Sequence, residues 1–121
     1  MNKAAFFLLF LFLIVGSVKA QCTSTYSMAT YALAHTKKSL SSDNFDHQKL
    51  YAERAIESFE KDRELVKACG CEESLAQIEK GLDNLYKAVD PKDWEEGRYY
   101  TKKALANAHE LISTLDICTN K

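Results

Sequence analysis

The stretch Cys69-Gly70-Cys71 marks the middle of a symmetric arrangement of cysteines. Cys22 lies 47 residues before Cys69, and Cys118 lies 47 residues after Cys71. An even number of cysteines in a short exported chain is typical of a disulfide framework. The equal spacings predict two disulfides, Cys22–Cys69 and Cys71–Cys118. The alternative of Cys22–Cys118 with Cys69–Cys71 stays open, and it is less favoured because the second bridge would close a tight ring.

The rest of the sequence repeats with an offset of 49 residues, which is also the offset from Cys22 to Cys71 and from Cys69 to Cys118. Identical residues coincide at Leu33 and Leu82, Lys38 and Lys87, Tyr51 and Tyr100, and Ala55 and Ala104. Repeats of this length are usually supersecondary units that stack on one another. We therefore expect that one helical hairpin, residues 22–69, is duplicated as a second, residues 71–118.

Apolar residues recur at steps of three and four, the spacing of one helical face. The clearest stripe consists of Leu75, Ile78, Leu82, Leu85 and Val89, whereas its counterpart in the first copy has small and polar members. One proline and four glycines leave few places where helices would break. We predict helices at 23–41, 44–68, 72–89 and 92–116, with Asp90 and Pro91 starting the last. Short connections then predict an all-α, antiparallel up-down-up-down four-helix bundle.

Residues 1–20 have the features of a secretory signal peptide: Lys3, an apolar run from Phe6 to Val15, and small residues before position 21. The run is shorter than the roughly 20 apolar residues that a membrane span needs. We therefore expect a mature chain, residues 21–121, that forms a single domain, has no membrane span, and is secreted or periplasmic.

The charge balance of the mature chain excludes some classes of partner. Removal of residues 1–20 leaves 14 basic and 17 acidic residues. A nucleic-acid-binding protein would need a basic face, so no nucleic acid is expected as a partner. The densest charged segment, residues 60–64, alternates in sign and predicts a solvated helix face.

The sequence offers no motif for catalysis. It has no Gly-x-Ser-x-Gly nucleophile motif and no glycine-rich phosphate loop. We therefore expect neither an enzyme nor a bound cofactor.

The cysteines also suggest two chemical alternatives to a structural role. Four thiolates could hold zinc, although Cys-x-Cys with two distant cysteines differs from the usual paired ligands of structural zinc sites. Cys69-Gly70-Cys71 could be a redox motif, although Glu72 and Glu73 disfavour a thiolate at Cys71. An extracytoplasmic redox or metal-binding protein that uses the cysteine-rich end is therefore the first alternative.

Aromatic residues near the starts of the second and fourth helices are the candidate binding surface: Phe45, Trp94, Tyr99 and Tyr100. Trp and Tyr are frequent at binding hot spots, and the adjacent Tyr99 and Tyr100 cannot both face the core. A further alternative is a small apolar ligand between the helices, in space left by Ala29, Ala52, Ala55, Ala104 and Ala108. The favoured hypothesis is a small, exported, disulfide-stapled helical module that binds a protein partner or another copy of itself.

Overall fold

The computed structural model describes residues 22–120, and these residues form four α-helices and no strand. The N-terminal helix includes residues 22–40. It is followed by α2 (Phe45–Cys69), α3 (Glu72–Val89) and α4 (Trp94–Thr119). The prediction of an all-α domain with four helices is confirmed. The signal peptide predicted for residues 1–20 lies outside the described residues.

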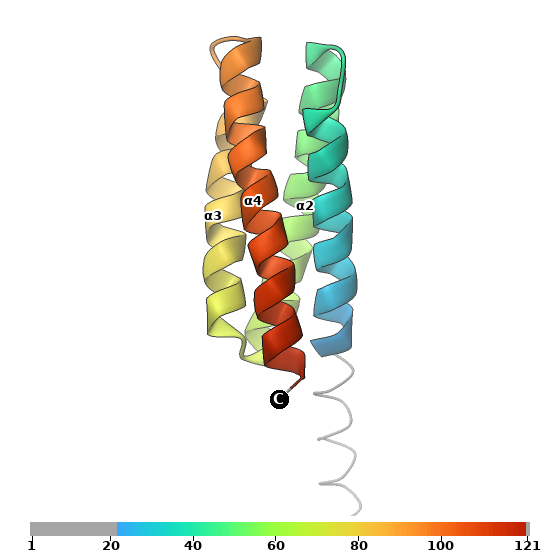
Figure 1. The fold of residues 1–121 in the computed structure, drawn as a ribbon, viewed down its shortest axis with the longest axis vertical. Helices are drawn as coiled ribbons and strands as arrows, with labels where there is room; N and C mark the ends of the chain where they lie inside the picture. Colours follow the sequence, from blue (N-terminus) through green and yellow to red (C-terminus); the bar gives the residue numbers. More distant parts are fainter. Residues whose placement is uncertain (1–21, 121) are drawn as a thin grey trace, which may run out of the picture.

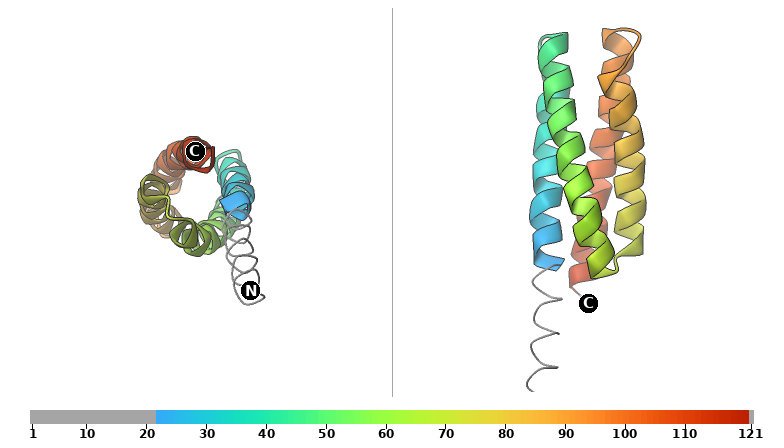
Figure 2. Two further views of the ribbon diagram at one scale, coloured as in Figure 1. Left: turned by 90° about the horizontal axis from the view of Figure 1, so that it is seen from below. Right: turned by 180° about the vertical axis from the view of Figure 1, so that it is seen from behind.

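The four helices lie side by side along the long axis of the molecule (Figures 1 and 2). The connections 41–44 and 90–93 lie at one end, called here the loop end. The Gly70 turn and the described C-terminus lie at the other end, called here the disulfide end. Seen along the long axis, α2 and α4 are diagonally opposite, whereas α3 lies next to both (Figure 2).

Helices α2 and α4 both begin at a capping residue, and α2 ends at a glycine. The Asn44 side chain accepts a hydrogen bond from the backbone N–H of His47 at 2.9 Å, and Asp93 accepts one from Glu96 at 2.8 Å. Such N-caps satisfy backbone donors that have no partner within the helix. Gly70 ends α2 in the left-handed conformation, with φ of 79°, and its N–H donates to Val66 O at 3.0 Å. A left-handed residue after a helix is usually glycine, because it has no Cβ to clash.

The predicted start of the last helix was wrong. We expected Pro91 to occupy its first position, but α4 begins at Trp94 behind the Asp93 cap. Asp90 and Asp93 are both good capping residues, so composition alone did not distinguish them. The offset of 49 residues distinguishes them, because Asp93 lies 49 residues after the Asn44 cap.

Both predicted disulfides are confirmed. Cys22 is bonded to Cys69, with 5.3 Å between the Cα atoms, and Cys71 is bonded to Cys118, with 6.1 Å. Both separations are usual for disulfides. In the chain-entropy view each bridge, which spans 47 residues, stabilises the fold by about 4 kcal/mol.

The core is unusually rich in small and polar side chains. Its large, fully buried apolar residues are Phe59, Val66, Ile78, Leu82, Leu85, Leu111 and Leu115. None of them belongs to the N-terminal helix, which buries only Thr25, Ala29, Ala32, Thr36 and Ser39. The five alanines that suggested room for an apolar ligand are all 0% exposed and pack within this core.

Within residues 22–120, no helix combines the length and the apolar character required to cross a membrane.

Candidate functional site

The four aromatic residues of the predicted binding surface lie on α2 and α4 toward the loop end. Phe45 and Trp94 are the first residues of these helices. Tyr99 is 55% exposed, whereas Tyr100 is half-buried. The two tyrosine rings pack edge to face, with centroids 5.1 Å apart. Such an arrangement brings the positive edge of one ring to the negative face of the other and holds both in place.

Basic side chains cover three of these rings. The Arg98 guanidinium lies 5.8 Å from the centre of the Trp94 ring, and Lys103 Nζ lies 5.0 Å from that of Tyr99. Lys87 of α3 lies 5.4 Å from the ring of Tyr100. At exposed sites each cation–π contact contributes roughly 0.5–1 kcal/mol. The contacts therefore fix the positions of the basic groups more than they stabilise the fold.

The same contact occurs at the corresponding place in the first hairpin. Lys38 lies 5.7 Å from the ring of Tyr51, and Arg54 covers that ring at 5.4 Å. Lys38 and Tyr51 are the counterparts of Lys87 and Tyr100 at an offset of 49. Lys38 with Tyr51 and Lys87 with Tyr100 thus make the same contact between helices.

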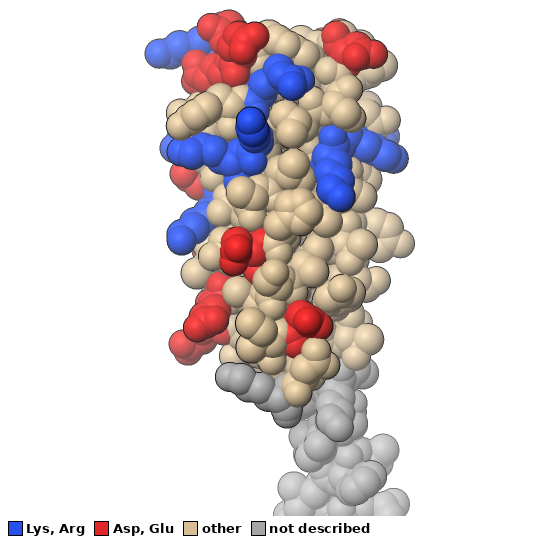
Figure 3. Space-filling view, in the orientation of Figure 1, with Lys and Arg blue, Asp and Glu red and all other residues tan. Residues whose placement is uncertain are grey.

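Five basic residues are concentrated in one area, the halves of α4 and of the N-terminal helix that are nearer the loop end. We call this area the basic surface; it consists of Lys37, Lys38, Arg98, Lys102 and Lys103. The N-terminal helix contains no acidic residue between positions 22 and 40, and α4 contains none between 97 and 109. Figure 3 shows the basic side chains of this face mainly in the half nearer the loop end, with acidic side chains toward both ends.

The charges of the basic surface form no ion pair with an acidic side chain of the described residues. Among residues 22–120 the ion pairs are Arg63–Glu79, Lys67–Glu64 and Lys87–Asp83, none of which includes its residues. Arg98 donates instead to the backbone carbonyl of Leu40 at 2.8 Å, which joins α4 to the end of the N-terminal helix. Exposed Tyr99 lies beside these charges through its contact with Lys103.

The basic residues that cover these rings were not predicted from the sequence, although part of the arrangement has a sequence signal. Two contacts had a local signal, since Trp94 and Arg98, like Tyr99 and Lys103, are four residues apart on one helix. The contacts between helices had a different signal, the identity of Lys38 with Lys87 and of Tyr51 with Tyr100.

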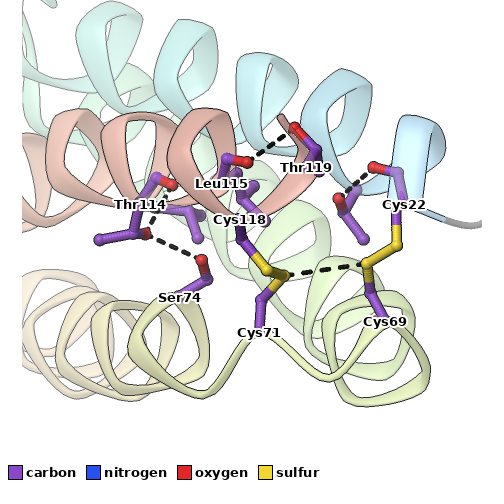
Figure 4. Close-up of a disulfide and its surroundings, with 10 residues drawn as sticks. Cys22, Cys69, Cys71, Ser74, Thr114, Leu115, Cys118 and Thr119 are labelled. Atoms are coloured by element: carbon purple, nitrogen blue, oxygen red, sulfur yellow. Dashed lines mark hydrogen bonds between the residues drawn. A yellow bond between two sulfur atoms is a disulfide. The ribbon is translucent and has the colours of Figure 1, made fainter. Parts of the chain in front are cut away.

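The disulfide end brings all four cysteines together. The Sγ atoms of Cys69 and Cys71, which belong to different disulfides, are 3.8 Å apart. Beside them lies a pocket of about 230 Å³ that is lined by residues of the Gly70 turn, α3 and α4, including Cys71, Ile117 and Cys118. Ser74 donates a hydrogen bond to Thr114 Oγ1 at 2.9 Å across the base of this region (Figure 4).

The core contains polar groups without hydrogen-bond partners. Asp62 and Gln48 are both 0% exposed. Neither the two carboxylate oxygens of Asp62 nor the terminal amide oxygen and nitrogen of Gln48 have a hydrogen-bond partner. Burial raises the pKa of Asp62 from 3.8 to about 7. The expectation that residues 60–64 form a solvated face is therefore wrong at Asp62, because this position lies on the buried side of α2.

No family model, curated protein or solved structure matches this chain. The sequence and the geometry described above therefore carry the functional argument alone.

Proposed function

We propose that this chain is a small exported binding module whose basic surface contacts an acidic area on a protein partner. The observation that carries the proposal is the set of five positive charges that form no ion pair within residues 22–120, next to the 55% exposed ring of Tyr99. Complementary charge guides association and favours correct partners. A neighbouring tyrosine adds contact area at a small cost in conformational entropy.

We also propose that the domain is an antiparallel up-down-up-down bundle that arose by duplication of one helical hairpin. The buried positions support this, because the set 25, 29, 32, 36 and 39 reappears at an offset of 49 as 74, 78, 81, 85 and 88. The matching contacts of Lys38 with Tyr51 and of Lys87 with Tyr100 support it further. A disulfide in each hairpin suits an oxidising compartment, as proposed for an exported protein.

The contacts of Arg98 hold part of the basic surface in place before a partner binds. Arg98 connects α4 to the N-terminal helix through Leu40 O, and its guanidinium also packs over Trp94. The partner would therefore meet basic groups that are already positioned. Preorganisation of this kind raises affinity because less side-chain freedom is lost on binding.

The proposal is tested by capture with the mature protein as immobilised bait. The source organism's extracellular fraction is passed over the native bait and over a variant with Lys102→Glu and Lys103→Glu. A matched control carries Lys61→Glu and Lys80→Glu, which make the same charge change at exposed positions of α2 and α3. Far-UV circular dichroism establishes that all three baits are equally helical.

We expect a protein that is retained by the native and control baits, lost with the Lys102/Lys103 variant, and weakened by Tyr99→Ala. Its retention should decrease with added salt, since exposed charges are screened beyond about 10 Å at 0.1 M ionic strength. If the control variant loses the same protein as the Lys102/Lys103 variant, the basic surface is not the binding site. If sedimentation equilibrium shows that the partner is a second copy of the chain, the proposal of a separate protein partner is wrong.

A further inference from the structure

The two disulfides touch each other. Cys69 and Cys71 are separated by one residue, and their Sγ atoms lie 3.8 Å apart. Figure 4 shows the four sulfur atoms in a row, in the order Cys118, Cys71, Cys69, Cys22. Thiol–disulfide exchange requires a thiolate that attacks one sulfur of a disulfide while the other sulfur leaves. This row places a sulfur of each disulfide next to the sulfur that it would attack in the other.

We propose that the two disulfides form one exchange unit, in which a single external thiol opens both hairpins through formation of a Cys69–Cys71 bond. The external reagent is a small monothiol of the glutathione class. The chemistry is thus an additional activity, separate from binding through the basic surface.

The first step is attack of the monothiol, as its thiolate, on Cys22 Sγ. A mixed disulfide forms between the reagent and Cys22, the Cys22–Cys69 bond breaks, and the electron pair leaves on Cys69 Sγ. Cys22 is accessible to the reagent because it is half-buried, as are Cys69 and Cys118, whereas Cys71 is only 5% exposed. The proton of the monothiol passes to solvent.

The second step is internal. The Cys69 thiolate attacks Cys71 Sγ, the Cys69–Cys71 bond forms, the Cys71–Cys118 bond breaks, and Cys118 leaves as a thiolate that takes a proton from solvent. One thiol and two disulfides are present before and after, so no net oxidation or reduction is needed. Attack at half-buried Cys118 gives the mirror sequence, in which Cys71 attacks Cys69 and Cys22 leaves.

The residue between the two cysteines suits the new ring. Gly70 has a φ of 79°, and a Cβ atom placed there would meet no atom within 4 Å. The turn therefore has open space around it and a residue that can change backbone conformation at little cost. The released Cys118 thiol would line the pocket at the disulfide end beside Ile117, which is 62% exposed. It would there be accessible to a partner's disulfide.

The test identifies which cysteine becomes a free thiol after treatment with the monothiol. The native mature protein is treated with an equimolar monothiol, trapped with a maleimide, and digested with trypsin. The sequence places Cys22 in peptide 21–37, Cys69 and Cys71 together in peptide 68–80, and Cys118 in peptide 104–121. We expect the monothiol adduct on 21–37, the maleimide on 104–121, and an internal disulfide in 68–80, or the mirror product with adduct and label interchanged.

The internal step can be tested without the external monothiol by use of a variant. Cys22→Ser leaves Cys69 as a thiol beside the second bridge, and we expect a measurable fraction of the molecules to carry the maleimide on peptide 104–121. Dilution of the protein about tenfold should leave that fraction unchanged, because the step is intramolecular. The double variant Cys22→Ser/Cys69→Ser is the matched control and should leave 104–121 unlabelled.

Label on peptide 68–80 alone, in both the native protein and Cys22→Ser, would overturn the proposal. A fraction on 104–121 that falls in proportion to dilution would also overturn it, since exchange would then occur between molecules. If Cys22→Ser does not fold, the native protein decides through the same three peptides.

Discussion

The buried carboxyl of Asp62 predicts an unusual pH dependence of stability. It lies on the core side of α2, is 0% exposed, and has no hydrogen-bond partner for either oxygen. Burial raises its pKa to about 7 in the folded protein, whereas an aspartate in an unfolded chain has a pKa of about 3.9. Between these values the folded state holds a proton that the unfolded state has lost.

The sign of the effect follows from linkage. Because the folded state binds more protons in this range, its stability is greatest below about pH 4, falls as the pH rises to about 7, and is constant above that as far as Asp62 is concerned. The slope is about 1.4 kcal/mol per pH unit, and the whole change is about 4 kcal/mol. Most proteins instead gain stability over this range, because their carboxylates are paired in the folded state.

The surroundings of Asp62 contain little charge that would oppose this. The N-terminal helix has no charged residue before Lys37 apart from His35, and Glu79 of α3 is paired with Arg63 of α2 at 3.5 Å. His109 and Glu110 on α4 are exposed. His35 acts in the opposite direction: burial, with Lys38 and Arg54 nearby, lowers its pKa, so its contribution to stability rises with pH up to about 6.5.

The variant Asp62→Asn isolates the effect, since it keeps the side-chain shape and removes the titration. Urea unfolding measures the free energy of unfolding of both proteins from pH 4 to pH 8. The variant's value minus the native value should be about 4 kcal/mol larger at pH 8 than at pH 4. The matched control is Glu53→Gln, which removes an exposed carboxylate from the same helix. It should run parallel to the native protein. If native and Asp62→Asn proteins have the same slope between pH 4.5 and 7, the buried-carboxyl argument is refuted.

Two further predictions concern packing. A Cβ atom at Gly81 would lie 2.9 Å from Cζ of the fully buried Phe59 ring, so Gly81→Ala should destabilise the fold by about 1–2 kcal/mol, despite the better helix propensity of alanine. Urea unfolding measures this, and a gain of stability would contradict it. The N-terminal helix buries no large apolar side chain, so reduction of both disulfides should free it first. Hydrogen exchange should then accelerate at residues 22–40 before α3 and α4, and equal acceleration everywhere would show that the helix is held by other contacts.

The sequence predicted those features that depend on local periodicity or on spacing. Helix α3 was predicted with its correct bounds because its apolar stripe is regular and Gly70 precedes it. The disulfides were predictable because hairpins of equal length bring the ends of their helices together. The start of α4 was misplaced because two aspartates three residues apart could both act as the cap, and only one of them has a counterpart in the first hairpin.

The candidate site was harder to predict because it depends on contacts between helices. Lys87 lies over Tyr100 although thirteen residues separate them in sequence, and periodicity within one helix cannot indicate such a pair. Asp62 was misread because its neighbours, Lys61 and Arg63, are charged. Its counterpart at an offset of 49 is Leu111, a core residue. Comparison of positions 49 residues apart therefore indicates that position 62 is buried.

The proposed duplication explains why large and small core residues face each other. Gln48 and Gly97 are counterparts on the diagonally opposite helices α2 and α4, and a Cβ atom at Gly97 would lie 3.1 Å from either terminal amide atom of Gln48. Two identical hairpins would bring either two glutamines or two glycines to this place. The first would collide and the second would leave a void, and a close-packed core tolerates neither well. A duplicated hairpin can therefore pack on its copy at this place only after the residues at positions 48 and 97 diverge.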